Sequence, residues 1–170
     1  MAQLKRIGLA LLAVCVLAAV AVAAASGAGG TTVKAVGKAT FKPNVGVSDT
    51  QHWSPGTISV ASGARVTWRN ATRTGDPHTI TIVTKRDLPR GFECSACDRA
   101  LRSHGVDPAT GRVANPVVNV GAAGLDAPGD SLLLPPHGRA SAVVSAGAGT
   151  TLYYVCSIHP WMQGRIRVHH

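Results

Sequence analysis

The sequence has few aromatic residues and few acidic ones. Its 170 residues include 3 Trp, 2 Tyr and 2 Phe, and 8 acidic side chains stand against 17 lysines and arginines, for a formal net charge of +9. The basic residues are scattered and few rings are available to stack on bases, so we expect no nucleic-acid binding. A positive charge of this size suits an acidic partner or an anionic surface.

Cysteine is also scarce, with 4 residues in the whole chain. Cys15 lies inside an apolar N-terminal run. Cys94 and Cys97 are near neighbours and can pair with each other in an oxidising compartment, which leaves Cys156 free to act as a ligand. A buried apolar thiol or half of a disulfide is the alternative for Cys156.

The N-terminus has the layout of a secretory signal. Lys5 and Arg6 precede an unbroken apolar run that ends at Ala25 and is followed by small residues. We predict that residues 1–25 form the signal peptide, with cleavage after Ala25 or, nearly as well, after Ala28. Since about twenty apolar residues span a bilayer, a retained membrane anchor is the alternative. Either way the rest is predicted to be exported, to the periplasm, the extracellular space or the outer face of the membrane.

Residues 26–170 form one ordinary domain by length. The roughly 145 residues suffice for a real core and leave little room for a second domain. Without Lys5 and Arg6, 15 basic residues remain against 8 acidic ones, a net charge of +7. We expect a monomer that contacts a membrane only if the N-terminal segment stays uncleaved.

Short alternating segments separated by turn residues predict an all-β sandwich. In the first two segments, Ile58, Val60, Val66 and Trp68 share the face expected to point into the core. The predicted strands lie at residues 57–60, 65–68, 79–83, 142–144, 151–155 and 165–168.

Residues 85–130 interrupt this strand pattern and are predicted to be an insertion or elaborated loop. It contains one short helix from about Cys94 to Ser103, stopped by Gly105. A local disulfide between Cys94 and Cys97 is the simplest interpretation. A redox-active C-x-x-C motif and a second metal site with His104 are the alternatives.

The chemistry concentrates between the last two predicted strands. Cys156, His159 and Met162 are spaced three residues apart there. A thiolate, two imidazoles and a weak axial thioether are the ligand set of a blue copper site, whereas zinc in a structural site recruits four strong ligands. The methionine therefore favours copper, although it is also compatible with a core position at a strand start.

The second imidazole is predicted to come from His78, which follows a tryptophan-bearing strand and leads into the apolar strand predicted at 79–83. That position holds a side chain rigidly at the edge of a sandwich. A structural histidine is the alternative reading of the same residue. The competing candidates are His52, His104, His137, His169 and His170.

These segments resemble a known family. The string from Cys156 to Met162, followed after one residue by a glycine and a strand, resembles the ligand loop of amicyanin and related plastocyanin-like cupredoxins. The stretch from Ser54 to His78 is similar to the strand pair and first ligand loop of the same family, and the run 149–154 adds to the likeness. Together these segments cover less than half of residues 26–170.

The resemblance implies a Greek-key sandwich with one copper ion near one end, held by His78, Cys156, His159 and Met162. It also implies that the ring edge of His159 reaches the surface. Family members commonly carry Asn after the first histidine, where this chain has Thr79. The hydroxyl and backbone N–H of Thr79 are expected to serve as donors to the ligand loop or the thiolate.

The predicted function is one-electron transfer between redox partner proteins, with Pro160 and Trp161 forming an apolar docking patch beside His159. The sequence shows no nucleophile or acid–base pair, so we expect no enzymatic activity. A copper chaperone or storage protein is the main alternative. A cupredoxin-fold adhesion module without metal is the third possibility.

Overall fold

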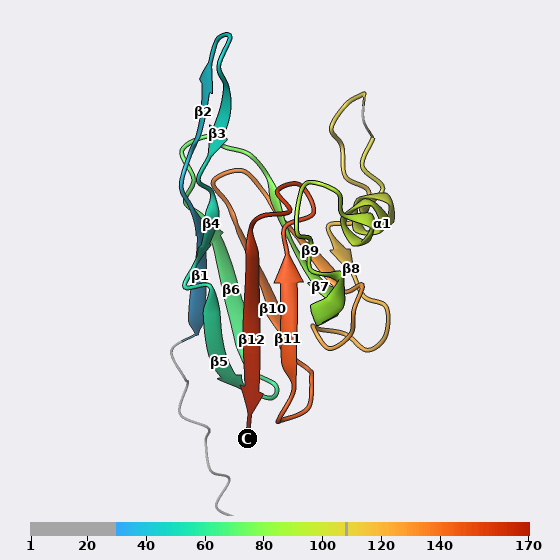
Figure 1. The fold of residues 1–170 in the computed structure, drawn as a ribbon. Helices are drawn as coiled ribbons and strands as arrows, with labels where there is room; N and C mark the ends of the chain where they lie inside the picture. The colour runs from blue at the N-terminus through green and yellow to red at the C-terminus, as the bar shows by residue number, and fades with distance from the viewer. Residues whose placement is uncertain (1–29, 108) are drawn as a thin grey trace, which may run out of the picture.

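The computed structural model describes residues 30–107 and 109–170, and in it two β-sheets pack face to face (Figure 1). The signal predicted at residues 1–25 lies outside the described residues. Within the described part of the chain, no helix is long and apolar enough to cross a membrane. The predicted all-β sandwich is confirmed.

The first sheet has four strands and the second has six. In spatial order the first contains β10 (Arg139–Val143), β6 (Arg65–Asn70), β1 (Thr31–Val36) and β4 (His52–Ser54). The second contains β5 (Thr57–Ala61), β12 (Gln163–His169), β11 (Thr151–Val155), β7 (His78–Val83), β9 (Ser131–Leu134) and β8 (Val117–Val118). A separate hairpin consists of β2 (Ala39–Lys42) and β3 (Gly46–Asp49).

The chain crosses repeatedly between the sheets. The connections β5–β6, β6–β7, β9–β10 and β10–β11 each join strands of different sheets. Two neighbouring pairs, β1–β6 and β5–β12, run parallel, and the other pairs are antiparallel. This crossing places the C-terminal ends of β11 and β6 and the N-terminal end of β7 near one end of the sandwich, which is where the site forms.

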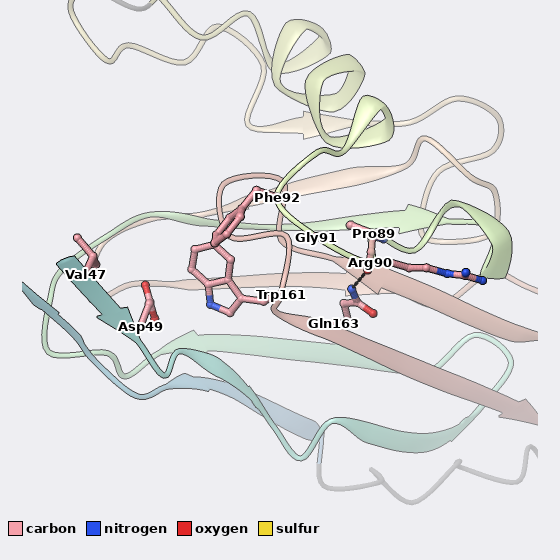
Figure 2. A pocket seen from close by; sticks show the side chains of 8 residues that line it. All are labelled: Val47, Asp49, Pro89, Arg90, Gly91, Phe92, Trp161 and Gln163. Atoms are coloured by element: carbon pink, nitrogen blue, oxygen red, sulfur yellow. Dashed lines mark hydrogen bonds between the residues drawn. The ribbon is translucent and has the colours of Figure 1, made fainter. Parts of the chain in front are cut away.

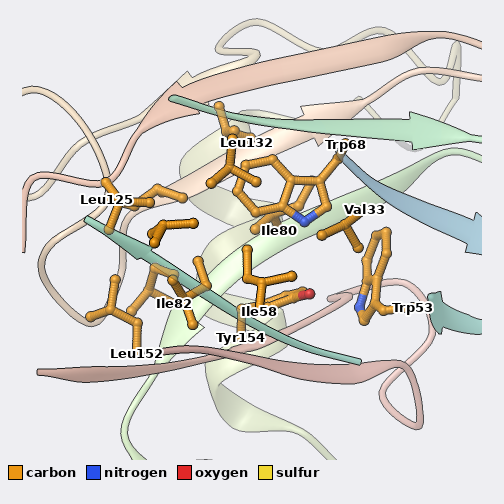
Figure 3. Close-up of a cluster of buried hydrophobic side chains, with 14 of the residues drawn as sticks. Val33, Trp53, Ile58, Trp68, Ile80, Ile82, Leu125, Leu132, Leu152 and Tyr154 are labelled. Atoms are coloured by element: carbon orange, nitrogen blue, oxygen red, sulfur yellow. The ribbon is translucent and has the colours of Figure 1, made fainter. Parts of the chain in front are cut away.

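The core lies between the sheets and is built by strand alternation (Figure 3). In β6, Val66 and Trp68 point inward and are fully buried, whereas Arg65 and Arg69 are exposed. The four residues predicted to face the core, Ile58, Val60, Val66 and Trp68, are all buried. Alternate side chains of a strand point to opposite faces, so a period of two residues fixes which face is apolar.

Strand β7 departs from this alternation because all six of its residues are buried. Its outer face is covered by the region that follows it, which holds a 3-10 turn (Lys85–Asp87) and helix α1 (Ser95–His104). Cys97 of α1 packs with Val83 and Val155 in a small second core. A strand covered on both sides needs apolar or well-paired side chains at every position.

Helix α1 has defined ends. It begins after Cys94, whose sulfur accepts the N–H of Cys97, and it ends at Gly105, which adopts a left-handed φ of 61° and donates its N–H to Arg102 O. The short helix predicted from about Cys94 to Ser103 is confirmed. The disulfide between Cys94 and Cys97 is formed, with an S–S distance of 1.98 Å. An elaborated region with one helix therefore fits the predicted insertion.

Candidate metal centre

Residues 156–162, called the ligand loop below, connect β11 to β12. Two backbone hydrogen bonds within the loop hold its shape. Cys156 N donates to Met162 O over 3.0 Å, and Met162 N donates to His159 O over 2.8 Å. Cys156 and Met162 are fully buried, and His159 is 8% exposed. Antiparallel pairing of β11 with β12, which sets Val155 opposite Gln163, fixes both ends of this loop.

The pairing of β7 with β11 places His78 beside the ligand loop. His78 is the first residue of β7, and β7 pairs with β11 so that Thr81 lies opposite Val155. This register brings the start of β7 beside the end of β11. The potential ligand atoms of His78, Cys156 and His159 all lie within 4.8 Å of one another.

The geometry of these three side chains suits a shared ion. Nδ1 of His78 lies 3.7 Å from the sulfur of Cys156, and Nδ1 of His159 lies 3.6 Å from it. Bond lengths typical of zinc sites, about 2.0–2.1 Å to nitrogen and about 2.3 Å to sulfur, would set two ligand atoms of one ion about 3.7–3.8 Å apart at an angle of about 120°. Both imidazoles thus direct the same type of nitrogen at one sulfur. Met162 is buried in the same loop, and its role as the axial ligand stays a prediction.

Thr79 forms hydrogen bonds to the sulfur of Cys156 and to the backbone of Ser157. Its backbone N–H donates to Cys156 Sγ over 3.4 Å, and its hydroxyl accepts the N–H of Ser157 over 2.7 Å. The backbone N–H therefore donates to the sulfur as expected, whereas the hydroxyl, which was expected to donate, accepts a hydrogen bond from the loop. Burial raises the pKa of the Cys156 thiol, and the N–H of Thr79 opposes that rise by stabilising the thiolate.

Burial keeps both imidazoles neutral. It lowers the pKa of His78 from 6.5 to about 4, with a further contribution from the charge of His159. Burial also lowers the pKa of His159. A neutral imidazole is the form that ligates a metal, so the site offers two unprotonated nitrogens near neutral pH.

Two side chains that the sequence patterns did not single out fix the ends of the site. Trp53 donates its indole N–H to Met162 O over 3.1 Å and packs edge-on against the ring of His78. Asn70 donates to Asp76 O over 2.7 Å and to Pro135 O over 3.2 Å, which fastens the segment before His78. Neither residue type is a metal ligand, so only the fold shows their roles.

The other histidines are placed elsewhere. His104 is fully buried, and its two ring nitrogens lie 2.6 Å from Asn115 O and 2.8 Å from Ser131 Oγ. The alternative of a second metal site with His104 and the two disulfide cysteines is therefore wrong. The remaining four, His52, His137, His169 and His170, are exposed.

The surface beside His159 is aromatic. The ring of Trp161 packs edge-on against that of His159, with the ring centres 5.3 Å apart. Phe92 packs against Trp161 in the same way, with the ring centres 5.7 Å apart. Figure 2 shows Phe92 and Trp161 side by side in a pocket of about 650 Å³ that Val47 also lines. Pro160 was expected to contribute to this surface, but it is buried. The exposed aromatic neighbour of Trp161 is Phe92, which is 84% exposed.

The crossed two-sheet sandwich with a His–Cys–His group at its end has the architecture that the sequence resemblance to cupredoxins implies. No family model and no curated protein matches the sequence.

Several solved structures are similar to this chain. A purple cupredoxin from Nitrosopumilus maritimus is 18% identical with a TM-score of 0.45, covering 81% of this chain and 98% of its own. Auracyanin from Roseiflexus castenholzii is 19% identical with a TM-score of 0.44, covering 85% and 100%. A reduced amicyanin mutant is 19% identical with a TM-score of 0.39, covering 82% of each chain. At these values the function must be inferred from the site residues themselves.

Proposed function

We propose that this chain is an exported blue copper protein that carries single electrons between redox partners. The observation that supports this most is the convergence of Nδ1 of His78 and Nδ1 of His159 on the sulfur of Cys156, 3.7 Å and 3.6 Å away. Met162, fully buried in the same loop, is the proposed fourth ligand. Copper bound by such a set supplies one-electron Cu(II)/Cu(I) chemistry.

Softness of the ligands favours copper over zinc. A buried thiolate and a thioether suit Cu(I), while two imidazoles suit Cu(II) as well, so one set of residues tolerates both oxidation states. Zinc in a structural site is ordinarily held by four strong ligands, and methionine is not one of them. Other titratable ligands are absent from this cluster among the described residues.

The residues around the ligands hold them in place. Thr79 fixes the sulfur and the Ser157 amide, and Trp53 fixes the backbone of Met162. Hydrogen bonds that anchor ligands in advance keep their positions similar in both oxidation states, so little rearrangement opposes electron transfer. Because Cys156 and His78 are fully buried, water is kept from the site.

The burial of the proposed ligands favours an electron carrier over a copper chaperone or storage protein. A chaperone must pass its ion to another protein by ligand exchange, which requires ligands that an incoming thiol or imidazole can reach. Here His78 and Cys156 are fully buried, and His159 is 8% exposed. Such a site favours retention of the ion and exchange of electrons through the His159 edge.

The proposed partner docks on the aromatic surface beside His159. Trp161 is 39% exposed and contacts the His159 ring, so a partner that covers it approaches the metal centre closely. The net charge of +9 in the whole sequence suits an acidic partner, and attraction of this kind mainly speeds encounter.

Copper titration followed by visible absorption tests the proposal. Adding Cu(II) to the wild-type protein is expected to give an intense sulfur-to-copper band at one ion per chain, and Cys156→Ser is expected to abolish it. A wild type that binds only Cu(I) without a band supports the chaperone or storage alternative. A wild type that binds no copper supports a structural module, and either result contradicts the carrier.

A further inference from the structure

A buried histidine outside the metal centre is connected to it by hydrogen bonds. His104 is the last residue of α1, and its side chain is fully buried against the second sheet. Its Nδ1 lies 2.6 Å from Asn115 O. A carbonyl oxygen only accepts, so Nδ1 carries the proton in the neutral ring and Nε2 is the acceptor. Nε2 lies 2.8 Å from Ser131 Oγ, so the Ser131 hydroxyl donates to it.

From Ser131 the connection continues across the sheet through three more hydroxyl residues. Ser131 and Thr81 are direct partners in the β7–β9 pair, and their hydroxyl oxygens lie 2.8 Å apart. The Thr81 hydroxyl lies 3.0 Å from that of Thr79 and 2.8 Å from that of Ser157. We call Ser131, Thr81, Thr79 and Ser157 the hydroxyl chain. All four are buried.

The imidazole fixes the direction of every bond in this chain, because each hydroxyl has one proton to donate. The proton of Ser131 is used on His104, so Thr81 donates to Ser131. Thr79 and Ser157 must then both donate to Thr81. The oxygen of Thr79 is left as an acceptor, and it takes the N–H of Ser157 over 2.7 Å. A single arrangement of protons therefore satisfies the whole network.

We propose that His104 is a positioning residue for the metal centre, acting through the hydroxyl chain on the Thr79–Ser157 contact that anchors the ligand loop. The inference rests on the function proposed above. Hydrogen bonds in a low-dielectric interior polarise one another, and a fully satisfied network holds its members rigidly. The acceptor at His104 thus strengthens the hold of Thr79 on Ser157, the residue next to the ligand Cys156.

Without the His104 acceptor, the hydrogen bonds of the hydroxyl chain no longer have a single fixed direction. In His104→Leu, the Ser131 proton has no buried acceptor other than Thr81, so the Ser131–Thr81 bond can reverse and the Thr79 oxygen becomes a weaker acceptor. The hold on the Ser157 amide loosens as a result. Packing of α1 depends on other side chains, since Cys97 lies with Val83 and Val155 in the second core.

The test compares His104→Leu with His104→Gln and Ser131→Ala. The glutamine amide offers an NH2 group as donor and a carbonyl oxygen as acceptor, and Ser131→Ala cuts the hydroxyl chain while leaving the imidazole in place. Ser62→Ala is the control, because the Ser62 hydroxyl donates to Ala146 O near the opposite end of β12. Two quantities are measured: amide hydrogen exchange of Ser157 in the metal-free protein, relative to Ile166 of β12, and Cu(II) affinity by competition.

We expect His104→Leu and Ser131→Ala each to speed Ser157 exchange about tenfold and to weaken Cu(II) binding about tenfold, the lower end of the range for residues that orient metal ligands. The double variant is expected to match either single one. His104→Gln and Ser62→Ala are expected to remain within about twofold of wild type in both quantities.

Variants that lose stability while Ser157 exchange, relative to Ile166, stays at the wild-type value would overturn the inference, because a purely structural role predicts that result. Ser131→Ala decides the question if His104→Leu does not fold. A wild type that binds no copper contradicts the proposed function instead, and Ser157 exchange then still shows whether His104 holds the loop.

Discussion

The backbone N–H of Thr79 donates to the sulfur of Cys156 over 3.4 Å, across 77 positions of sequence. The same residue accepts the N–H of Ser157 with its hydroxyl. One residue of β7 therefore anchors two consecutive residues of the ligand loop. Because the pairing of β7 with β11 sets this contact, the sheet itself positions the sulfur.

Replacing the Thr79 hydroxyl is expected to loosen the loop. Thr79→Val keeps the backbone N–H to the sulfur but leaves the buried Ser157 N–H without its acceptor. We expect the free energy of unfolding to fall by about 1–3 kcal/mol and Cu(II) affinity to fall about tenfold. Urea unfolding and a copper competition titration measure the two effects. Thr79→Ser retains the hydroxyl and should match wild type, and equal values for Val and Ser would show that the hydroxyl is dispensable.

Adding a methyl group at Gly164 is expected to disturb the core beside the site. A Cβ there would collide with the ring and hydroxyl of Tyr154, which packs against Trp53 and Trp68. Overpacking of this kind costs about 1–3 kcal/mol. Gly147→Ala is the matched control, because no atom lies within 4 Å of its added Cβ. Thermal unfolding compares the two variants, and similar melting temperatures would contradict the predicted collision.

Acid is expected to destabilise the metal-free protein through His78. Its pKa falls from 6.5 to about 4 on folding, so the unfolded state binds this proton more readily. Stability is therefore at its full value above about pH 6.5 and is lost as the pH falls to about 4, by on the order of 3 kcal/mol. The lowered pKa of His159 acts in the same direction. Urea unfolding at a series of pH values measures the slope, which His78→Gln should reduce. An equal slope in both proteins would contradict the assignment to His78.

Truncating the aromatic surface is expected to slow electron exchange without altering the copper site. Trp161→Ala removes the ring that contacts His159, and Phe92→Ala removes the ring that packs on Trp161; both rings line the pocket in Figure 2. Exposed aromatic anchors are each worth about 1.4 kcal/mol or more at an interface, so electron self-exchange between two copies should slow about tenfold. Line broadening in mixtures of both oxidation states measures this rate. Val117→Ala, at an exposed position of the edge strand β8, should leave it unchanged. Rates that stay at the wild-type value in both aromatic variants would place electron exchange elsewhere.

The proposed ligand set could be assembled from the sequence because most of it is local. Cys156, His159 and Met162 lie within seven residues, and the spacing alone suggests the chemistry. His78 followed from its place between a tryptophan-bearing strand and an apolar one. Five of the six predicted strands have bounds within two residues of β5, β6, β7, β11 and β12, whereas the predicted segment 142–144 overlaps only the end of β10.

The remaining features depend on long-range contacts. Strand β9, Ser131–Leu134, lacks alternation because three of its four residues are buried, so a period of two residues could not reveal it. The hydroxyl chain exists only through the register that pairs Thr81 with Ser131. Pro160 was placed on the surface because it adjoins His159, but the turn points it inward.

X-ray absorption at the copper edge of the Cu(II)-loaded protein tests the central claim most directly. The proposed ligands predict one short copper–sulfur contact from Cys156 and two imidazole nitrogens, and the sulfur contribution should disappear in Cys156→Ser. A wild-type spectrum with only nitrogen and oxygen neighbours would contradict the assignment of His78, Cys156 and His159 as ligands of a single copper ion.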